Sequence, residues 1–246
     1  MKFYEDKTVW VIGGTSGIGL AFAENISKMK NCNVIISGRD TSKVNDISTF
    51  EKVTLDVLNA ENFSSTTDFL LQKYTKIDVI LFCAGAYEPM NIDNFNSKIA
   101  TNILNTNLSS MVNFVENIPK FYGKCSTIGI VGSVAGYFGM PNSLFYGASK
   151  AGLVNLTESL SIELAKHKIN VKLISPGFVK TTLTNKNNFK MPFLISAEKA
   201  AEIIVKKLPC NKFEIAFPFL FAMIMKFLQK MPFKFRAIIF NSSKFN

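Results

Sequence analysis

The chain contains 246 residues, 48% of them hydrophobic, and carries a formal net charge of +10 at pH 7. This length and apolar content suit a folded α/β domain with its own core, and they argue against intrinsic disorder. Four cysteines that form no CxxC pair, together with a single histidine, argue against a disulfide framework, a metal site and a Ser-His-Asp triad.

The sequence predicts neither export nor membrane insertion. The first residues lack the apolar stretch of a signal peptide. The longest uncharged apolar run, residues 215–225, is interrupted by Pro218 and is shorter than the roughly 18–20 residues that span a bilayer. We therefore expect a soluble, cytoplasmic protein in which residues 1–246 form a single domain.

Short β-branched runs alternate with longer helical patterns, which is typical of βα units on a parallel sheet. The predicted strands are 8–12, 33–37, 52–55, 78–82, 126–131, 170–174 and an edge strand at 213–217. The predicted helices are one ending near residue 30, then 59–74, 97–118, 146–166, and 199–207 with Ser196 as N-cap. Because parallel crossovers are right-handed, this alternation predicts a doubly wound α/β fold, with a seven-stranded, mainly parallel sheet of order 3-2-1-4-5-6-7 and helices on both faces.

A glycine-rich turn joins the first predicted strand to the first predicted helix. Gly13, Gly17 and Gly19 follow the pattern Gly-x3-Gly-x-Gly. Glycine allows a tight turn and a close approach of the backbone to a pyrophosphate, which the free N–H groups at the helix start then bind. Between a strand and a helix, the pattern predicts nucleotide binding.

A second group of polar residues lies in the middle of the chain. Tyr146 and Lys150 form a Tyr-x3-Lys pattern, and Ser133 lies thirteen residues before the tyrosine. Together with the glycine turn, these residues resemble the short-chain dehydrogenase/reductase family over at least residues 8–205. The resemblance implies a Rossmann domain and hydride transfer between a nicotinamide cofactor and a carbonyl/alcohol pair. It also implies that Tyr146 is the acid–base, that Lys150 holds the nicotinamide ribose, and that Ser133 hydrogen-bonds the reacting oxygen.

Physical chemistry supports these roles for the tyrosine and the lysine. Tyr146 and Lys150 are four positions apart at the head of a predicted helix, so their side chains share a face. A phenol has a pKa of about 10 and is a poor acid–base at neutral pH unless a neighbouring ammonium stabilises the phenolate. We therefore expect Lys150 to lower the pKa of Tyr146, so that the tyrosine exchanges a proton with the substrate oxygen.

An asparagine completes the catalytic site that the resemblance implies. Asn107 falls where the family has the asparagine that kinks the long helix around a water, which relays protons to the lysine. Asn105 is a nearby alternative. We favour Asn107 because its separations from Gly85 and Ser133 along the chain fit the family, and because an asparagine inside a helix otherwise competes with the backbone.

The end of the second predicted strand bears on the choice of cofactor. Gly38 stands where an acidic residue would bind the ribose hydroxyls of NAD, and Arg39 offers a planar guanidinium suited to a phosphate. The resemblance therefore implies a preference for NADP over NAD, with Asp56 at the adenine edge. The cofactor-binding residues that it implies are Gly13, Thr15, Ser16, Gly17, Ile18, Gly19, Arg39, Asp56, Ala84, Gly85, Tyr146, Lys150, Pro176, Gly177, Val179 and Thr181.

Two positions depart from the family pattern. Ile12 replaces the usual threonine before the first glycine, and Phe82-Cys83 replace the asparagines ahead of Ala84-Gly85. Since losing both partners of a polar pair together is close to neutral, we interpret the change as a repacked floor beneath the cofactor. The alternative is a nucleotide-binding sensor or scaffold that no longer turns over, against which the intact four-residue site argues.

The segment 180–195 predicts the character of the substrate. It contains Phe189, Met191, Phe193 and Leu194, and an apolar loop of this kind favours a bulky or fatty carbonyl compound. Neither the identity of the substrate nor the physiological direction of the reaction follows from the sequence.

The C-terminal extension, residues 209–246, differs from the rest of the chain in charge. From Lys206 onward the chain has eight basic residues and one acidic residue, Glu214. The basic residues are interleaved with apolar ones and no nucleic-acid-binding motif is present, so binding to nucleic acid is not expected.

The extension is expected to form one or two short helices that begin at Pro218 and Pro232. Phe219, Met223 and Phe227 recur at four-residue spacing and form an apolar stripe. We expect this stripe to pack on its own domain or on a second subunit. Contact with an anionic membrane surface is the alternative, and burial of all three side chains within one chain would argue against it.

Overall fold

The computed structural model describes residues 2–42, 44 and 50–242. Residues 241 and 242 are described by their backbone alone. Met1 and residues 243–246 of the predicted extension lie outside the described residues.

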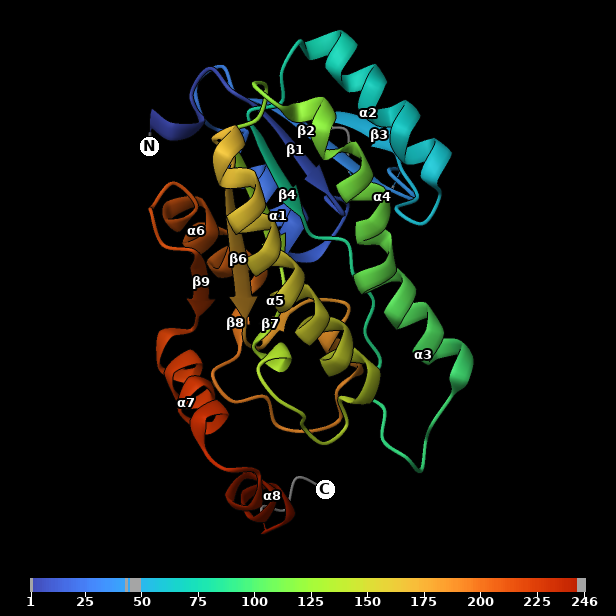
Figure 1. The fold of residues 1–246 in the computed structure, drawn as a ribbon, viewed down its shortest axis with the longest axis vertical. Helices are drawn as coiled ribbons and strands as arrows, with labels where there is room; N and C mark the ends of the chain where they lie inside the picture. Colours follow the sequence, from blue (N-terminus) through green and yellow to red (C-terminus); the bar gives the residue numbers. More distant parts are fainter. Residues whose placement is uncertain (1, 43, 45–49, 243–246) are drawn as a thin grey trace.

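A seven-stranded parallel sheet forms the centre of the molecule (Figure 1). Its order is β3-β2-β1-β4-β5-β6-β9, and every neighbouring pair is parallel. This confirms the predicted doubly wound topology, with the last strand numbered ninth because two short strands precede it. The strands are β1 Thr8–Ile12, β2 Asn33–Gly38, β3 Glu51–Thr54, β4 Val79–Phe82, β5 Thr127–Val131, β6 Asn170–Pro176 and β9 Glu214–Phe217.

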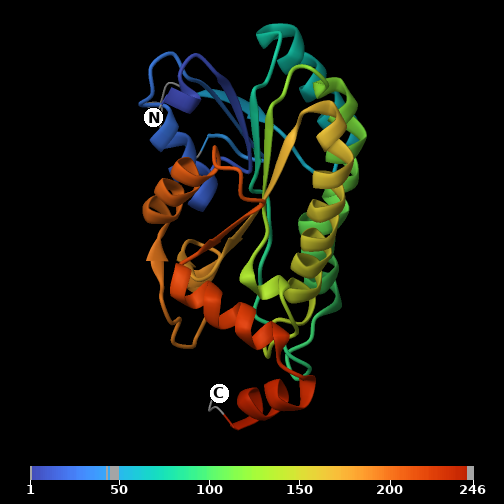
Figure 2. The ribbon, with the colours of Figure 1, turned by 60° about the vertical axis from the view of Figure 1, so that its left-hand side comes forward.

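Helices cover both faces of the sheet (Figure 2). The α1 and α6 helices pack on one face, and α2, α4 and α5 pack on the other. All five residues of β1 are buried, and they alternate between the two cores, with Trp10 and Ile12 in one and Val9 and Val11 in the other. The helices are α1 Gly17–Ile26, α2 Ala60–Tyr74, α3 Ser97–Leu104, α4 Ser110–Asn117, α5 Leu144–Leu164 and α6 Ala197–Lys207.

Short elements complete the domain. Single turns of 3-10 helix lie at Lys2–Tyr4, Ile118–Phe121, Val134–Gly136, Ala165–His167 and Thr184–Lys186. The prediction missed a second, two-stranded sheet, which β7 (Val179–Lys180) forms with β8 (Ile195–Ser196). It holds the two ends of the apolar segment 180–195 together.

Two helices follow the last strand, as the two prolines predicted. They are α7, Phe219–Lys230, and α8, Phe233–Ser242. Both lie at the end of the domain toward which the strands of the central sheet point (Figure 1). None of the described helices is long and apolar enough to cross a membrane.

Candidate active site

The carboxyl ends of the central strands open into a cavity of about 400 Å³. Its walls come from the loops after β1, β4, β5 and β6, from the start of α5 and from the C-terminal helices. This edge of a doubly wound sheet is where such folds bind their ligands. All the residues predicted to bind the cofactor line it: Gly13, Thr15, Ser16, Gly17, Ile18, Gly19, Arg39, Asp56, Ala84, Gly85, Tyr146, Lys150, Pro176, Gly177, Val179 and Thr181.

Backbone hydrogen bonds hold the glycine turn after β1 against the end of β2. The N–H groups of Gly13 and Gly14 both donate to the carbonyl oxygen of Ser37, at 2.8 and 3.0 Å. Gly13 has a φ of +81°, and a Cβ there would lie 2.5 Å from the amide nitrogen of Ala84. A Cβ at Gly19 would lie 2.3 Å from the carbonyl oxygen of Gly13. The turn therefore admits only glycine at these positions and fits a pyrophosphate drawn close to its backbone.

Replacing Gly19 by Ala is expected to lower both stability and cofactor binding. The new methyl group would overlap the backbone of the turn, a strain worth about 1–3 kcal/mol in unfolding free energy. We expect the affinity for NADPH to fall about tenfold or more, as measured by fluorescence titration. Gly139→Ala is the matched control, because a Cβ at Gly139 would meet no atom within 4 Å. Equal NADPH affinities in the two variants would contradict this role of the turn.

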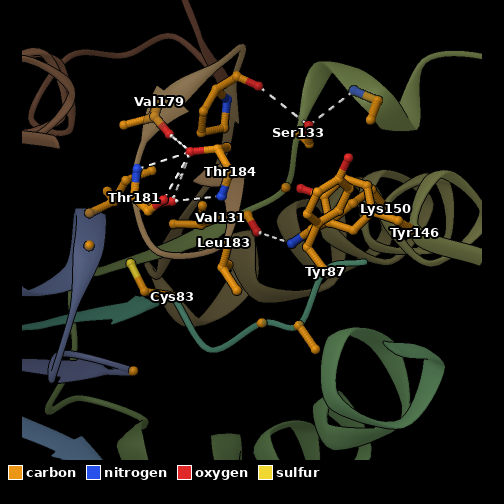
Figure 3. A pocket seen from close by; sticks show the side chains of 18 of the residues that line it. Cys83, Tyr87, Val131, Ser133, Tyr146, Lys150, Val179, Thr181, Leu183 and Thr184 are labelled. Carbon is orange, nitrogen blue, oxygen red and sulfur yellow. Dashed lines mark hydrogen bonds between the residues drawn. The ribbon is translucent and has the colours of Figure 1, made fainter. Parts of the chain in front are cut away.

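Ser133, Tyr146 and Lys150 come together on one side of the cavity (Figure 3). Ser133 follows β5, and its hydroxyl donates to the carbonyl oxygen of Pro176 at 3.4 Å. Tyr146 and Lys150 lie in the first two turns of α5, with Lys150 Nζ 5.8 Å from the centre of the Tyr146 ring. Lys150 is buried, and its ammonium group donates to the carbonyl oxygen of Val131 at 2.9 Å. The fold thus joins three polar groups that the sequence separates.

Burial determines the ionisation of these groups. It raises the pKa of Tyr146, and interaction with the Ser133 hydroxyl offsets that rise only in part. It lowers the pKa of Lys150 to about 8, an effect that the thiol of Cys83 opposes. The prediction that Lys150 lowers the pKa of Tyr146 is therefore wrong here, because burial raises that pKa and the Ser133 hydroxyl is the group that acts to lower it. At neutral pH the phenol keeps its proton, and this is the form that donates to a carbonyl oxygen.

The predicted long helix 97–118 is interrupted where the sequence has its two asparagines. A π-helical segment, Asn105–Ser109, separates α3 from α4. Asn105 is exposed, whereas Asn107 is fully buried. Extra residues inserted into a helical turn in this way bend the helix and redirect a side chain. The π-helical segment lies at the position where the resemblance implied a kink.

Asn107 lies behind the cavity wall and holds that wall in place. Its amide oxygen accepts a hydrogen bond from the N–H of Ala86 at 2.6 Å, and its amide nitrogen donates to the Ser149 hydroxyl at 2.9 Å. A Cβ at Gly85 would be 3.3 Å from that amide oxygen and 3.9 Å from Lys150 Nζ. The asparagine therefore connects the loop after β4 to α5, next to the buried lysine.

The two departures from the family pattern meet beneath the glycine turn. Ile12 is fully buried, and the backbone N–H of Cys83 donates to its carbonyl oxygen at 2.7 Å. Burial raises the pKa of the Cys83 thiol to about 12, so the thiol is neutral. The backbone still connects the ends of β1 and β4 although neither side chain is strongly polar, which fits a repacked floor.

Arg39 and Asp56 line the end of the cavity next to β2 and β3. Arg39 directly follows β2 and is exposed. Asp56 accepts a hydrogen bond from the N–H of Leu58 at 3.0 Å, as an aspartate that closes a turn does. A Cβ at Gly38 would lie 2.8 Å from the hydroxyl of Thr15, so a longer side chain there requires that threonine to shift. This end of the cavity presents a cation and has no carboxylate at position 38.

Thr184 is a lining residue that the sequence analysis missed. Its hydroxyl donates to the carbonyl oxygen of Val179 at 2.6 Å and accepts from the N–H of Thr181 at 3.0 Å (Figure 3). These bonds fix the segment after β7 where it begins its 3-10 turn. The Thr-x-x-Thr spacing is a local capping signal that would have located it.

The loop after β4 and the segment after β7 meet across the cavity. Tyr87 donates its hydroxyl to Asn187 Oδ1 at 2.6 Å, and its ring packs edge-on against Tyr146 with the centroids 4.7 Å apart. Lys186 forms an ion pair with Glu88 at 2.6 Å beside them. The two polar contacts join residues 100 and 98 positions apart, so no local pattern in the sequence indicated them.

The C-terminal helices supply part of the cavity wall. Phe221 and Met225 of α7 and Phe240 of α8 line the cavity. The Phe221 ring lies 5.6 Å from the Phe178 ring and 5.8 Å from that of Phe193, centroid to centroid. The outer part of the cavity is therefore apolar and aromatic, and the sequence analysis did not assign these tail residues to it.

Glu214, at the start of β9, connects the tail to the loop that carries Ser133. Its carboxylate accepts hydrogen bonds from the hydroxyls of Tyr137 and Ser175, the latter at 2.6 Å, and from Lys226 of α7. Burial acts to raise the pKa of Glu214, but the three donors together hold it below its ordinary value. The half-buried carboxylate is therefore ionised and fully hydrogen-bonded.

Comparison with known proteins identifies relatives of the whole fold. Residues 7–192 match the short chain dehydrogenase family. The chain is 32% identical over 218 residues to the 3-oxoacyl-acyl-carrier-protein reductase of Rickettsia prowazekii, covering 85% of this chain and 84% of that protein. A short chain dehydrogenase from Burkholderia cenocepacia in complex with NADP has a TM-score of 0.85 at 19% identity and covers 95% of this chain and 97% of its own. One from Burkholderia phymatum in complex with NAD has a TM-score of 0.80 at 19% identity, covering 92% and 94%.

Proposed function

The chain belongs to the short-chain dehydrogenase family and is an NAD(P)-dependent oxidoreductase, and on this basis we propose that it reduces an apolar carbonyl compound with NADPH. The observation that carries the proposal is the meeting of Ser133, Tyr146 and Lys150 in a cavity that also contains the glycine turn. Its inner part suits a dinucleotide, and its outer part is apolar.

Each polar residue has a separate task in the proposed reaction. Bound NADPH supplies the hydride that reduces the carbonyl carbon. Ser133 donates a hydrogen bond to the carbonyl oxygen, and Tyr146 gives that oxygen the proton that completes the alcohol. The ammonium of Lys150 stabilises the phenolate left on Tyr146 and binds the ribose hydroxyls. Asn107 holds the backbone beside Lys150 and so positions the path along which Tyr146 regains its proton.

The substrate class rests on the aromatic wall of the cavity. Phe178, Phe221 and Met225 offer apolar surface beyond the polar group, which suits a hydrocarbon chain or ring next to the carbonyl. The names of the Rickettsia relatives make a 3-oxoacyl thioester a natural probe. A panel of 3-oxoacyl thioesters, aliphatic ketones and sugars, followed by NADPH absorbance, tests the proposal. Oxidation of NADPH with the acyl and aliphatic members supports it, and no turnover with any member favours the nucleotide-binding sensor or scaffold.

Removal of the Arg39 guanidinium is expected to abolish a preference for NADPH over NADH. Arg39→Ala loses the cation that pairs with the 2′-phosphate, and hydrogen bonds to charged groups contribute about 1.5–3 kcal/mol. Titration of both cofactors should show NADPH affinity falling about tenfold or more, while NADH affinity stays within about twofold, because NADH has no 2′-phosphate. Equal affinities for the two cofactors in the native chain would refute the preference.

The proposal places the protein in the cytoplasm, with its whole chain acting as one unit. All four cysteines, Cys32, Cys83, Cys125 and Cys210, are free in the described part of the chain, as in proteins of reducing compartments. The proposed function also includes a peripheral contact through the tail. The side chains of Phe219, Met223 and Phe227 are 50–73% exposed, so the expected packing of this stripe on its own domain does not occur.

A further inference from the structure

The α7 helix is apolar on opposite sides. Phe221, Ala222 and Met225 face the domain, where Ala222 and Met225 are buried and Phe221 packs on the cavity wall. The opposite side has large apolar side chains that face outward: Phe219, Leu220, Met223, Ile224 and Phe227. A helix that is apolar all round is normally covered on every side.

The next helix also has exposed apolar side chains. Phe233 and Phe235 of α8 are 75% and 57% exposed. Both helices lie at the same end of the domain, with α7 across its front and α8 below it (Figure 2). We use the name tail surface for seven of the exposed apolar side chains of the two helices: Phe219, Leu220, Met223, Ile224, Phe227, Phe233 and Phe235. Single exposed apolar side chains are common, but a group of this size marks a contact.

The charged residues of the two C-terminal helices are all basic. No acidic residue follows Glu214 in the sequence. Lys230, at the end of α7, is three positions after Phe227 and seven after Met223, so it lies on the same face as these side chains. Lys234 is exposed between Phe233 and Phe235. The cations therefore border the apolar side chains and have long stems that reach past them.

The combination of basic and apolar side chains indicates which kind of partner covers the tail surface. A second copy packed on the same surface would place Lys230 and Lys234 near their own counterparts, with no carboxylate of the tail to pair with them. A lipid surface accepts both features, because aromatic and aliphatic side chains enter the acyl boundary and lysines bind anionic headgroups. We propose that α7 and α8 lie in the plane of an anionic membrane surface and attach the enzyme to it through the tail surface.

Flotation of the full chain with vesicles tests the proposal, and it is independent of any substrate. Vesicles of phosphatidylcholine with phosphatidylglycerol should carry the protein upward, and vesicles of phosphatidylcholine alone should carry several-fold less. Raising the salt concentration should weaken the binding to anionic vesicles. The double variant Phe219→Ser/Phe227→Ser should bind about tenfold more weakly or worse, and Lys230→Gln/Lys234→Gln about fivefold more weakly for each charge removed.

A control variant distinguishes binding through the tail surface from nonspecific binding by any exposed apolar side chain. Ile162, on α5, is 77% exposed and lies outside the tail. Ile162→Ser should float like the native chain, and NADPH titration checks that every variant is folded. Three results would overturn the proposal: no flotation with anionic vesicles, flotation that the tail variants leave unchanged, or a dimer in sedimentation that Phe219→Ser/Phe227→Ser dissociates.

Discussion

Tyr146→Phe is expected to lower kcat for carbonyl reduction by about 10²–10⁴-fold, the usual contribution of a positioned acid–base group. The ring stays in place, because it packs against Tyr87 with the centroids 4.7 Å apart, so only the proton donor is lost. The affinity for NADPH should stay within about threefold, since the glycine turn and Lys150 are untouched. Steady-state kinetics with the best substrate of the panel and a fluorescence titration measure the two quantities.

Tyr87→Phe is the matched control for that substitution. It removes a hydroxyl group in the same cavity, which donates a hydrogen bond to Asn187. This hydroxyl belongs to the ring that packs against Tyr146. It should change KM more than kcat, because the bond positions the segment over the substrate and takes no part in proton transfer. Retained turnover in Tyr146→Phe, or an equal loss of kcat in both variants, would remove Tyr146 from the mechanism.

The second large effect concerns pH. Carbonyl reduction needs the ammonium form of Lys150, whose pKa burial lowers to about 8. The Lys150 amine is protonated below that pH and loses its charge above it. We therefore expect kcat/KM to be independent of pH near neutrality. Above pH 8 it should fall by ~tenfold per pH unit, the slope of a single ionisation. Tyr146 cannot produce this fall, because burial raises its pKa above the ordinary value of about 10.

Lys150→Arg assigns the fall to the lysine. A guanidinium keeps its charge throughout this range, so the residual kcat/KM of the variant should be level through pH 8 and beyond. The profile of the native enzyme is measured with saturating NADPH and a substrate that does not itself titrate. A native profile that rises above pH 8, or a fall that persists unchanged in Lys150→Arg, contradicts the assignment.

The parts of the fold that follow from local patterns could be predicted from the sequence. Runs such as Thr8–Ile12 are β-branched and buried on both faces, so they indicate strands of a parallel sheet. The first helix was the least accurate, because it ends at Ile26 rather than near Lys30. Residues 27–30 have helical composition, but Asn31 adopts a left-handed φ of +51° and turns the chain back into β2.

The candidate site also has a part that could be predicted from the sequence and a part that could not. The family resemblance that Gly13, Ser133 and Tyr146 carry implied that they belong to one site, and all three line the cavity. The ionisation of Tyr146 was not predictable, because four-residue spacing shows that Lys150 is near but says nothing about burial. Contacts such as that of Tyr87 with Asn187 depend on loops brought together by the whole fold, which no local pattern encodes.

Glu214 has a consequence for how such a protein can change over evolutionary time. Its carboxylate is shared by Tyr137, next to the Ser133 loop, and Lys226, on the helix whose inner side lines the cavity. The C-terminal helices are therefore not an appended module that can be exchanged, lost or grafted onto another enzyme. The inner side of α7 forms part of the pocket wall, and its outer side is exposed. A change in the position of α7 therefore alters the outer surface of the enzyme and the shape of its pocket together.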